Sequence, residues 1–456
     1  MKKLLFLFGG LLFSWAITAQ NIENQAISYS DAALLFSGED DNGTARYNAM
    51  GGAFGALGGD FSATAINPAG AAVFNNSSFG ITFGLRNSTI NTNFYDTSVL
   101  SEDDFFNITQ AGGVLVFNAH RDSNWSKFVI GFNYNLARDY ETNWLVEGNS
   151  GFAPLTDFYD PNIVYPNIQG QTFKNFMNGE NGKFVLSFAS QYNDKLYIGA
   201  AITTHNIDFI QFAQAEEFNG DDIDNTFDVL ATQELLTTGS GVSFSAGIIA
   251  KPTQEIRLGI AIQSPTWYNL TETLRENDHQ IFINNEFDSE VLLPLSELEY
   301  NISTPARVTG SFAYVFGKEG LLSFDYTYKD YSNLKLRPSS DFNGENLDLE
   351  NNLKGSSQFK VGVEFRLDNI SLRGGYRYEE SPFINGPSNS IKRTYGDLTG
   401  YSFGIGFKFG NNTKLDLAYQ NTERQDLFKF QDVPNADPAN IDLTNDKFTA
   451  TLVIGL

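Results

Sequence analysis

The stretch that decides the fold is residues 358–379, which read QFKVGVEFRLDNISLRGGYRYE. Before the Asp368–Asn369 pair, the odd-numbered positions 359–367 are all apolar, and the even-numbered ones include Lys360, Glu364 and Arg366. A period of two is the spacing of the two faces of a β-strand, and two such runs joined by two residues predict a β-hairpin. Charged residues on the face that would point inward favour a wet lumen over the dry core of a soluble sandwich.

The same alternation recurs along the rest of the chain. Fourteen such segments follow one another, beginning near Phe79, Val114, Phe128, Lys183, Lys195, Val242, Glu255, Arg307, Leu321, Phe359, Ile370, Ser402, Lys414 and Phe448. Long polar links such as Asn87–Ala111 and Leu136–Gly182 alternate with short ones such as Asn193–Asp194. Long loops at one end and turns at the other are typical of outer-membrane barrels. We therefore predict an all-β fold, a fourteen-stranded antiparallel transmembrane β-barrel over residues 77–456.

The two ends of the chain indicate where such a barrel resides. Met1–Lys3 is basic, Leu4–Ile17 is apolar and Thr18–Ala19 is a plausible cleavage site, so residues 1–19 are predicted to be a signal peptide. The chain ends in an alternating strand, Phe448–Leu456, as outer-membrane barrels usually do. The predicted location is the outer membrane of a Gram-negative cell. Membrane lipid, lipopolysaccharide and the barrel assembly machinery are the expected partners of a monomer.

Composition excludes several classes of function. The 456 residues carry 54 acidic and 30 basic side chains and no cysteine, which argues against nucleic-acid binding and thiol chemistry. The three histidines are scattered: His120 is expected in a short turn, His205 at the loop end of a strand and His279 in a long loop. Without a nucleophile elbow or a paired base we predict no enzyme, and also no metal site and no cofactor. Glu39–Gly43 and Asp221–Asn225 lack calcium-loop spacing and are expected to be solvated loops.

Residues 20–76, ahead of the first strand, form a segment without strand periodicity. Ala26–Phe36 is expected to be a short helix capped by Ser30 or Asp31, and the pairs Gly51–Gly52 and Gly58–Gly59 allow tight turns. A barrel of about fourteen strands has a lumen too wide for its own side chains to fill. We therefore expect this segment to be an N-terminal plug (hatch) domain.

A family resemblance is carried by this segment. The run Gly51–Phe54 followed by Asn67–Gly70 resembles the hatch of FadL/TodX-type outer-membrane transporters, which carry long-chain fatty acids and other hydrophobic compounds. Weaker matches lie downstream at Gln263–Trp267, Thr304–Arg307 and Gly375–Pro382.

The resemblance implies an outer-membrane channel for passive uptake of hydrophobic small molecules. Ligand would be captured by extracellular loops, pass to a site inside the barrel and leave sideways through a kink in a wall strand near the hatch. Asn67, Pro68, Ala69 and Gly70 are then the candidate gating residues, although they equally fit a structural turn that seats the hatch.

The third strand, Phe128–Asn135, would be the exit wall, with Gly131 and Asn133 as the residues that interrupt its ladder. The alternative is that Gly131 only faces a crowded lumen.

Other functions stay open on the sequence: a haem or aromatic-compound receptor, a barrel scaffold of a protein secretion system, or an open porin. Two phenylalanine-rich stretches, Phe152–Phe158 and Phe209–Phe218, are expected in extracellular loops as a greasy entry groove. The inward charges are expected to pair with one another, because buried charges need partners, or to supply an arginine for a substrate carboxylate. They are Arg86, Arg257, Arg307, Asp325, Lys360, Glu364, Arg366, Arg373, Arg377 and Asp416.

Overall fold

The strands of this chain form one antiparallel sheet that closes on itself. The computed structural model describes residues 27–119, 123–152, 155–156, 162–221, 225–291, 295–410, 412–429 and 436–456. Closure is shown by β1 (Ser78–Phe94), which pairs with β2 (Thr97–Asn118) on one side and with the last strand, β21 (Ala439–Gly455), on the other. The predicted fourteen-stranded antiparallel barrel is confirmed.

Ten of the wall positions are single strands and four are split into two strands in line. The single ones are β1, β2, β7 (Asn167–Tyr192), β8 (Leu196–Gly220), β9 (Thr226–Ala250), β17 (Gly355–Leu367), β18 (Ile370–Glu379), β19 (Arg393–Phe409), β20 (Thr413–Phe428) and β21. The split ones are β3 (Trp125–Asp139) with β4 (Thr142–Gly148), β10 (Ile256–Gln263) with β11 (Trp267–Ile283), β14 (Arg307–Phe316) with β13 (Leu295–Ser303), and β15 (Gly320–Asp330) with β16 (Lys335–Arg337). Three short strands, β5 (Leu155–Thr156), β6 (Val164–Tyr165) and β12 (Glu286–Val291), complete the β-structure of the described residues.

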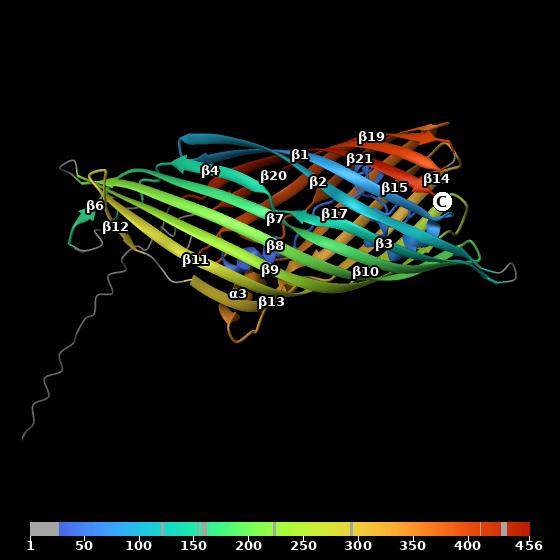
Figure 1. Cartoon of the computed structure of the whole chain (residues 1–456), viewed down its shortest axis with the longest axis horizontal. Helices are drawn as coiled ribbons and strands as arrows, with labels where there is room; N and C mark the ends of the chain where they lie inside the picture. Colours follow the sequence, from blue (N-terminus) through green and yellow to red (C-terminus); the bar gives the residue numbers. More distant parts are fainter. Residues whose placement is uncertain are drawn as a thin grey trace, which may run out of the picture.

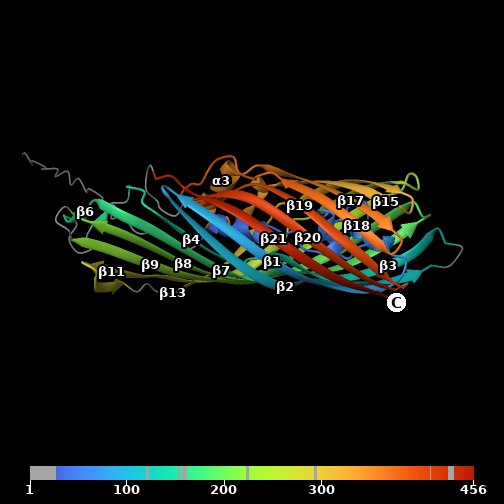
Figure 2. The ribbon, with the colours of Figure 1, turned by 90° about the horizontal axis from the view of Figure 1, so that it is seen from above.

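The strands are longer than predicted, and much of what was expected to be loop is strand. β1 and β2 run on to a turn at Tyr95–Asp96, and β7 begins at Asn167, so Asn87–Ala111 and most of Leu136–Gly182 are not loops. Beyond the membrane, the outer face of β1 carries polar residues such as Asn91 and Asn93, while Ile90 and Phe94 on its inner face are buried. The apolar outer face that marks a membrane strand in a sequence is therefore absent, although the pairing continues. β7 has 26 residues and is roughly 85 Å long, far more than a lipid-facing band of about 25 Å. Figures 1 and 2 show β7, β8, β9 and β11 extending beyond the rest of the barrel, away from the C-terminus.

The two faces of the wall differ in chemistry as a membrane barrel requires. Phe184, Phe365 and Phe403 are large apolar side chains that are 47%, 53% and 59% exposed on the outer face. Lys360 and Asp416 lie on the inner face and are buried. An apolar outside and a charged inside place this protein in the outer membrane as a multi-pass barrel.

No helix of the described residues is both long and apolar enough to cross a membrane.

The N-terminal segment, residues 27–76, lies inside the ring of strands, as the blue coils in Figures 1 and 2 show. It contains α1 (Tyr29–Ser37), α2 (Ala45–Ala49) and the 3₁₀ helices η1 (Ser62–Ala65) and η2 (Pro68–Val73). α2 contacts β19, β20 and β21, whereas η2 contacts β7, β8 and β9. The segment therefore reaches both sides of the lumen.

The predicted cap of the first helix was wrong. Ser28, rather than Ser30 or Asp31, caps α1, because its Oγ accepts a hydrogen bond from Asp31 N at 3.0 Å. Ser28 and Asp31 have the spacing of a capping box, in which the acidic residue belongs to the first turn and is not itself the cap.

A set of glycines on the inner wall allows this segment to lie directly against the strands. Six of them, on six different strands, would place an added Cβ against its residues: Gly199, Gly247, Gly259, Gly362, Gly375 and Gly404. A Cβ on Gly375 would lie 2.2 Å from Gly51 N, and one on Gly199 would lie 2.5 Å from Ala69 N. Glycine in a strand commonly marks such close approach of two backbones.

We predict that Gly375→Ala loosens the N-terminal segment, because the new methyl group meets backbone atoms of Met50 and Gly51 that cannot rotate away. Overpacking of this kind costs about 1–3 kcal/mol, which raises the population of the loosened state by roughly five- to a hundredfold. Limited proteolysis of the N-terminal segment in lipid nanodiscs measures it. The matched control is Gly374→Ala, whose nearest neighbour would be 3.7 Å away. Equal cleavage rates in the two variants would contradict the close-contact interpretation.

Candidate functional site

An apolar chamber occupies the lumen toward the end of the barrel where β7, β8 and β9 extend, away from the C-terminus. This end faces the cell exterior in proteins of this architecture. Barrel interiors are usually polar, but here the wall strands point apolar side chains inward. They are Met177, Ile207, Phe209, Leu235, Tyr268, Leu270, Leu274, Tyr300 and Ile302. Helix α1 fills the chamber with Ala32, Ala33, Leu34, Leu35 and Phe36, all buried.

Aromatic contacts hold α1 in place at both of its ends. The ring of Phe36 lies edge-on to Tyr140 and Phe209, with centroids 5.7 and 5.4 Å away. The ring of Tyr29 meets Tyr300 at 5.6 Å and Phe342 at 5.2 Å. Edge-to-face pairs of this kind add to the burial of the rings themselves. The helix is thus packed between the wall and the residues above it.

Those residues form a roof, which we define as residues 331–354 and 380–392. It carries η3 (Tyr331–Asn333), β16 and α3 (Asn343–Asn352), and its two parts meet in a β-bridge between Leu353 and Phe383. The carboxylate of Asp31 accepts hydrogen bonds from the backbone N–H groups of Lys392 (3.0 Å) and Arg393 (3.3 Å). Burial raises the pKa of Asp31 in spite of these hydrogen bonds. Ser28 Oγ, at the N-cap of α1, also donates to Ser390 O of the roof at 2.7 Å, so several polar contacts join α1 to the roof above the apolar chamber.

A strap, residues 38–43, leads from α1 across the lumen and is bound to opposite parts of the wall. Asp41 pairs with Lys360 of β17 at 2.7 Å and with Arg377 of β18 at 2.6 Å. Glu39 pairs with Lys183 of β7 at 2.9 Å and with Arg307 of β14 at 3.3 Å. Burial acts to raise the pKa of both acids, but the cations outweigh it and hold each pKa below its usual range. The strap is therefore anionic and firmly held at neutral pH.

The predicted pairing of inward charges is confirmed, but many of the partners come from the N-terminal segment, which the sequence did not indicate. Glu364 of β17 binds Arg46 of α2 at 2.8 Å and Arg373 of β18 at 2.7 Å, and Arg373 also binds Asp416 at 2.6 Å. Asp325 accepts hydrogen bonds from backbone N–H groups of the N-terminal segment at 2.8–2.9 Å. Arg257 donates a hydrogen bond to Leu57 O of the same segment at 2.7 Å. Many wall charges are thus satisfied by residues 39–57 rather than by each other.

A gap in the wall lies beside the strap, between β2 and the split position β3/β4. The ladder between β2 and β3 runs from Asn118 and Lys127 to Gln110 and Asn135 and stops there. Beyond it, β3 shifts register against β7 near Leu136 and breaks before β4. Among the described strands, residues 97–109 of β2 pair with β1 alone. The wall is therefore not closed by backbone hydrogen bonds at this level.

The strap takes the place of the missing strand partner. Asp40 N donates to Ala137 O at 2.7 Å, and Asn42 Nδ2 donates to Leu136 O at 2.9 Å. Asp139 N in turn donates to Asp40 Oδ2 at 3.1 Å. Buried backbone groups need partners, so these bonds stabilise β3 where β2 has left it. From β2, Asn107 Nδ2 donates across the gap to Asp139 Oδ2 at 2.9 Å.

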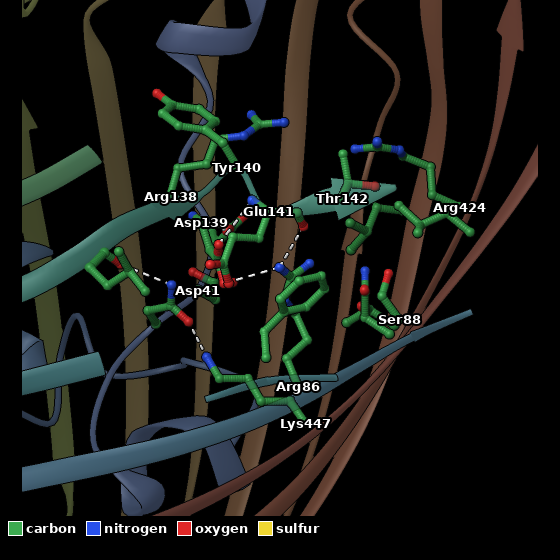
Figure 3. A pocket seen from close by; sticks show the side chains of 18 of the residues that line it. Asp41, Arg86, Ser88, Arg138, Asp139, Tyr140, Glu141, Thr142, Arg424 and Lys447 are labelled. Carbon is green, nitrogen blue, oxygen red and sulfur yellow. Dashed lines mark hydrogen bonds and ion pairs between the residues drawn. The ribbon is translucent and has the colours of Figure 1, made fainter. Parts of the chain in front are cut away.

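A cavity of about 160 Å³ lies behind the gap. Arg86 is its central cation: it pairs with Asp139 at 3.0 Å, donates to Glu141 O at 2.8 Å and lies 4.5 Å from the ring centroid of Phe105. Figure 3 shows Arg86 and Asp139 facing each other, with Asp41 of the strap close by. Leu35 of α1 also lines this cavity, so it adjoins the apolar chamber.

Asn67–Gly70 lie against the wall on the side of β8 and β9. Asn67 caps η2, and its Nδ2 donates to Gly55 O at 2.8 Å and to Ile248 O at 3.2 Å. An added Cβ on Gly247 would meet Asn67 Oδ1 at 2.1 Å. These contacts seat the N-terminal segment, and a gating role for Asn67–Gly70 stays a prediction.

Gly131 and Asn133 lie in the continuous part of the wall. Gly131 is opposite Val114 of β2 and Ser187 of β7, whereas the break in β3 begins at Leu136. An added Cβ on Gly131 would lie 2.5 Å from Ser187 Oγ and 3.9 Å from Ala71 of the N-terminal segment, so Gly131 faces the lumen. Asn133 donates to Phe61 O at 3.3 Å. Their predicted role in lateral exit is untested.

Several polar and aromatic positions differ from their predictions. Glu39–Gly43 is not a solvated loop but part of the strap. The feature of the sequence that could have indicated this is the acidic run itself, because inward-facing Lys and Arg residues of the strands need acidic partners. His205 lies in the middle of β8, buried, with Nδ1 3.2 Å from Tyr268 Oη. His279 lies in β11, and Phe209–Phe218 lie in β8, so neither is in a loop. The signal peptide, His120 and parts of Phe152–Phe158 and Asp221–Asn225 lie outside the described residues.

Comparison with known proteins agrees with this architecture. A family model described as "Outer membrane protein transport protein (OMPP1/FadL/TodX)" matches residues 31–437. Outer membrane protein P1 of Haemophilus influenzae is 25% identical over 181 residues, which cover 39% of this chain and 37% of that protein. The match thus spans little more than a third of that relative.

Solved structures show the same fold. A FadL homologue of Pseudomonas aeruginosa superposes with a TM-score of 0.62 at 15% identity, covering 91% of this chain and 99% of that one. The toluene transporter TodX of Pseudomonas putida gives 0.51 at 12% identity, covering 92% and 100%. With a family match over most of its length, this chain belongs to the OMPP1/FadL/TodX family of outer-membrane transport proteins.

Proposed function

We propose that this barrel takes up long-chain fatty acids or similar hydrophobic compounds by passive diffusion, and that it is not an enzyme. The observation that carries the proposal is the apolar chamber inside the lumen, next to a gap in the wall. Each CH₂ group removed from water favours binding by about 0.8 kcal/mol, so a long alkyl chain is held well by such a chamber. Transfer from chamber to membrane keeps that chain out of water and needs no energy source.

In this proposal the N-terminal segment is the hatch and the gap is the exit. A compound enters at the roof, moves along the apolar wall of the chamber as the hatch shifts, and leaves between β2 and β3/β4 into the outer leaflet. The cavity behind the gap, about 160 Å³, is too small for a long alkyl chain, so the strap must move for passage. Asn67–Gly70 then act as the fixed seat about which the rest of the hatch moves.

Small aromatic compounds are the second ligand class. TodX, a structural relative, is named as a toluene transporter, and an apolar cavity of about 150 Å³ is large enough for benzene. The cavity of this chain has that size but carries Arg86, Asp139 and Glu141 in its lining. That polar lining favours a ligand with a polar group over toluene.

The direct test is ligand binding by the folded barrel in lipid nanodiscs. We expect a long-chain fatty acid to displace a fluorescent fatty-acid analogue saturably, and toluene to displace it weakly. Stronger displacement by toluene would move the assignment to aromatic compounds. Absence of displacement by either would overturn the proposal.

Lateral exit predicts that bridging the gap blocks transport. Asn107 and Asp139 lie in contact across it, and the chain has no cysteine of its own. In Asn107→Cys/Asp139→Cys, a short bifunctional methanethiosulfonate should reduce fatty-acid uptake into proteoliposomes at least tenfold, while binding stays unchanged. Reduction should restore uptake. The controls are the untreated double variant and Asn107→Cys with reagent; undiminished uptake in the bridged barrel would exclude this exit.

The strap prediction concerns Asp41. Asp41→Asn leaves the buried cations Lys360 and Arg377 without their carboxylate partner, a change that costs about 3–5 kcal/mol in comparable pairs. We expect faster ligand release in stopped-flow fluorescence. Glu350→Gln, which breaks the exposed pair with Lys335 on the roof, is the matched control and should leave the rate unchanged. Equal rates in both variants would remove the strap from the exit.

The same ion pairs predict a pH dependence. The pKa of Asp41 is lowered in the folded protein, so its stabilisation is present above the unfolded value of about 3.9 and is lost as pH falls below it. The wild-type release rate should therefore be flat from about pH 8 to 5 and rise only below about pH 4. A rise centred near neutral pH would point to another group.

A further inference from the structure

A groove of about 940 Å³ lies on the outer face of four adjacent strands, β19, β20, β21 and β1. Figure 2 shows these four strands side by side. Ile441 of β21 and Phe428 of β20 are buried in a cluster with Trp144 of β4, so they point into the barrel. Successive side chains of a strand point to opposite faces, so Asn440 and Leu427, which line the groove, point outward.

The roof closes one side of this outer groove. Ser381 N donates to Asp397 Oδ1 at 2.7 Å, and Ser381 Oγ donates to Tyr395 O at 2.6 Å. These bonds fix the roof to β19, and Asn385 of the roof lines the groove as well. The groove is therefore a hollow with a strand floor and a bound edge.

A belt of aromatic side chains lies directly below the outer groove. On β19 the outward row is apolar up to Phe403 and Tyr401, which are 59% and 44% exposed, and it becomes polar at Thr399. Tyr419 of β20 and Phe448 of β21 continue the belt, with ring centroids 5.1 Å apart. Aromatic belts of this kind mark the boundary between membrane and water. The outer groove thus opens just outside the hydrocarbon layer.

Its height above the membrane can be derived from the strand geometry. Glu423, which lines the groove, is four residues beyond Tyr419 on β20. With a rise of about 3.3 Å per residue and a tilt of about 35–45°, Glu423 lies roughly 10 Å above the belt. The headgroup layer of a bilayer is about 5–7 Å thick on each side. Phospholipid headgroups end below this level, whereas the sugars of a glycolipid reach it.

The lining carries hydrogen-bonding groups that the protein does not use. Within the described residues, the side chains of Asn93, Glu423 and Asn440 have no hydrogen-bond partner. Gln425 Nε2 donates to Asp442 Oδ1 at 2.9 Å, which places a further amide and carboxylate beside them. Amides both donate to and accept from hydroxyl groups, and hydroxyl groups donate strong hydrogen bonds to carboxylates. Sugars are rich in such hydroxyl groups.

The charge of the lining selects among sugars. Arg424 is a cation of the lining, but it is already paired with Asp426 at 2.7 Å. Asp397, Glu423 and Asp442 also line the groove and make it acidic. Like charges placed together oppose binding, so phosphate groups and sugar acids are disfavoured. An uncharged sugar matches both the hydrogen-bonding groups and the charge.

We infer that the outer groove binds the uncharged sugars of a glycolipid of the outer leaflet. The inference goes beyond the proposed transport function and does not depend on it. Sugar hydroxyl groups donate to the carboxylate of Glu423 and pair with the amides of Asn93 and Asn440. The acyl chains of the same glycolipid lie in the membrane below, against Phe403 and Phe448.

The test is a titration of fluorescently labelled lipopolysaccharide with the full-length barrel in detergent, read by anisotropy. Lipopolysaccharide with a complete core should bind at least tenfold more tightly than a deep-rough form that lacks the uncharged core sugars. Equal affinity of the two forms would overturn the sugar assignment.

The free core oligosaccharide distinguishes the two sources of sugar. It should displace the labelled lipopolysaccharide only at a concentration at least tenfold above that of the intact glycolipid, because it has no acyl anchor. Equal potency would overturn the assignment to the leaflet and indicate a site for saccharides of the medium. Removal of its phosphate groups should leave its potency unchanged or increase it; a clear preference for the phosphorylated form would overturn the choice of an uncharged sugar.

Two variants connect this binding to the outer groove. Asn440→Trp fills part of the groove and should weaken binding of the complete-core form at least tenfold. Glu423→Gln, which keeps the volume, should weaken it several-fold. The matched control is Asn206→Trp, at an exposed asparagine of β8, and it should change nothing. Circular dichroism and heat-modifiable gel migration check that each barrel is folded. Wild-type affinity in both groove variants would overturn the inference.

Discussion

The interior of this barrel depends on the pairing of strap carboxylates with cations of the wall. Lys360 and Arg377 point into the lumen from β17 and β18, and both reach Asp41 of the strap. Buried charges without partners are strongly unfavourable, so these strands and the N-terminal segment need each other. Glu39 does the same for β7 and β14. Four wall strands are thereby tied to six residues in the middle of the lumen.

Different forces act on either side of that layer. On one side, wall glycines let the backbone near Gly51 and Asn67 lie against the strands. On the other, α1 is held by apolar and aromatic contacts in the chamber and by Asp31 at the roof. The charged layer is held by directed ion pairs, whereas the apolar contacts of α1 are non-directional.

The strap also explains how a gap in the wall is tolerated. A strand that loses its neighbour leaves unpaired N–H and C=O groups, which are costly in a membrane. Here Asp40 and Asn42 bind Leu136, Ala137 and Asp139, so three backbone groups of β3 beside the gap are satisfied from inside the barrel. The same contacts join the N-terminal segment directly to the part of the wall beside the gap.

The sequence by itself determined the barrel. Within the membrane, lipid on one face and a wet lumen on the other require strict alternation of apolar and polar residues. Segments such as Phe359–Leu367 and Ile370–Glu379 can therefore be recognised as strands in the sequence, and counting them gives the number of strands. Asn67–Pro68 and the paired glycines likewise marked the N-terminal segment, because their local conformations are unusual.

Only the tertiary structure decided which residues that are distant in the chain come into contact inside the barrel. Most of Asn87–Ala111 became strand because backbone pairing holds it, although the outer face of its first part is polar and lacks the apolar pattern of a membrane strand. Glu39 and Asp41 are half-buried in ion pairs whose cationic partners lie more than 140 residues away in the chain, so no local pattern indicates them. Ser28, Asp31 and Leu34 acquired a role only when the roof and the wall closed around them. Local pattern records what each residue faces across a strand, whereas a site assembled from distant strands exists only after the barrel has closed.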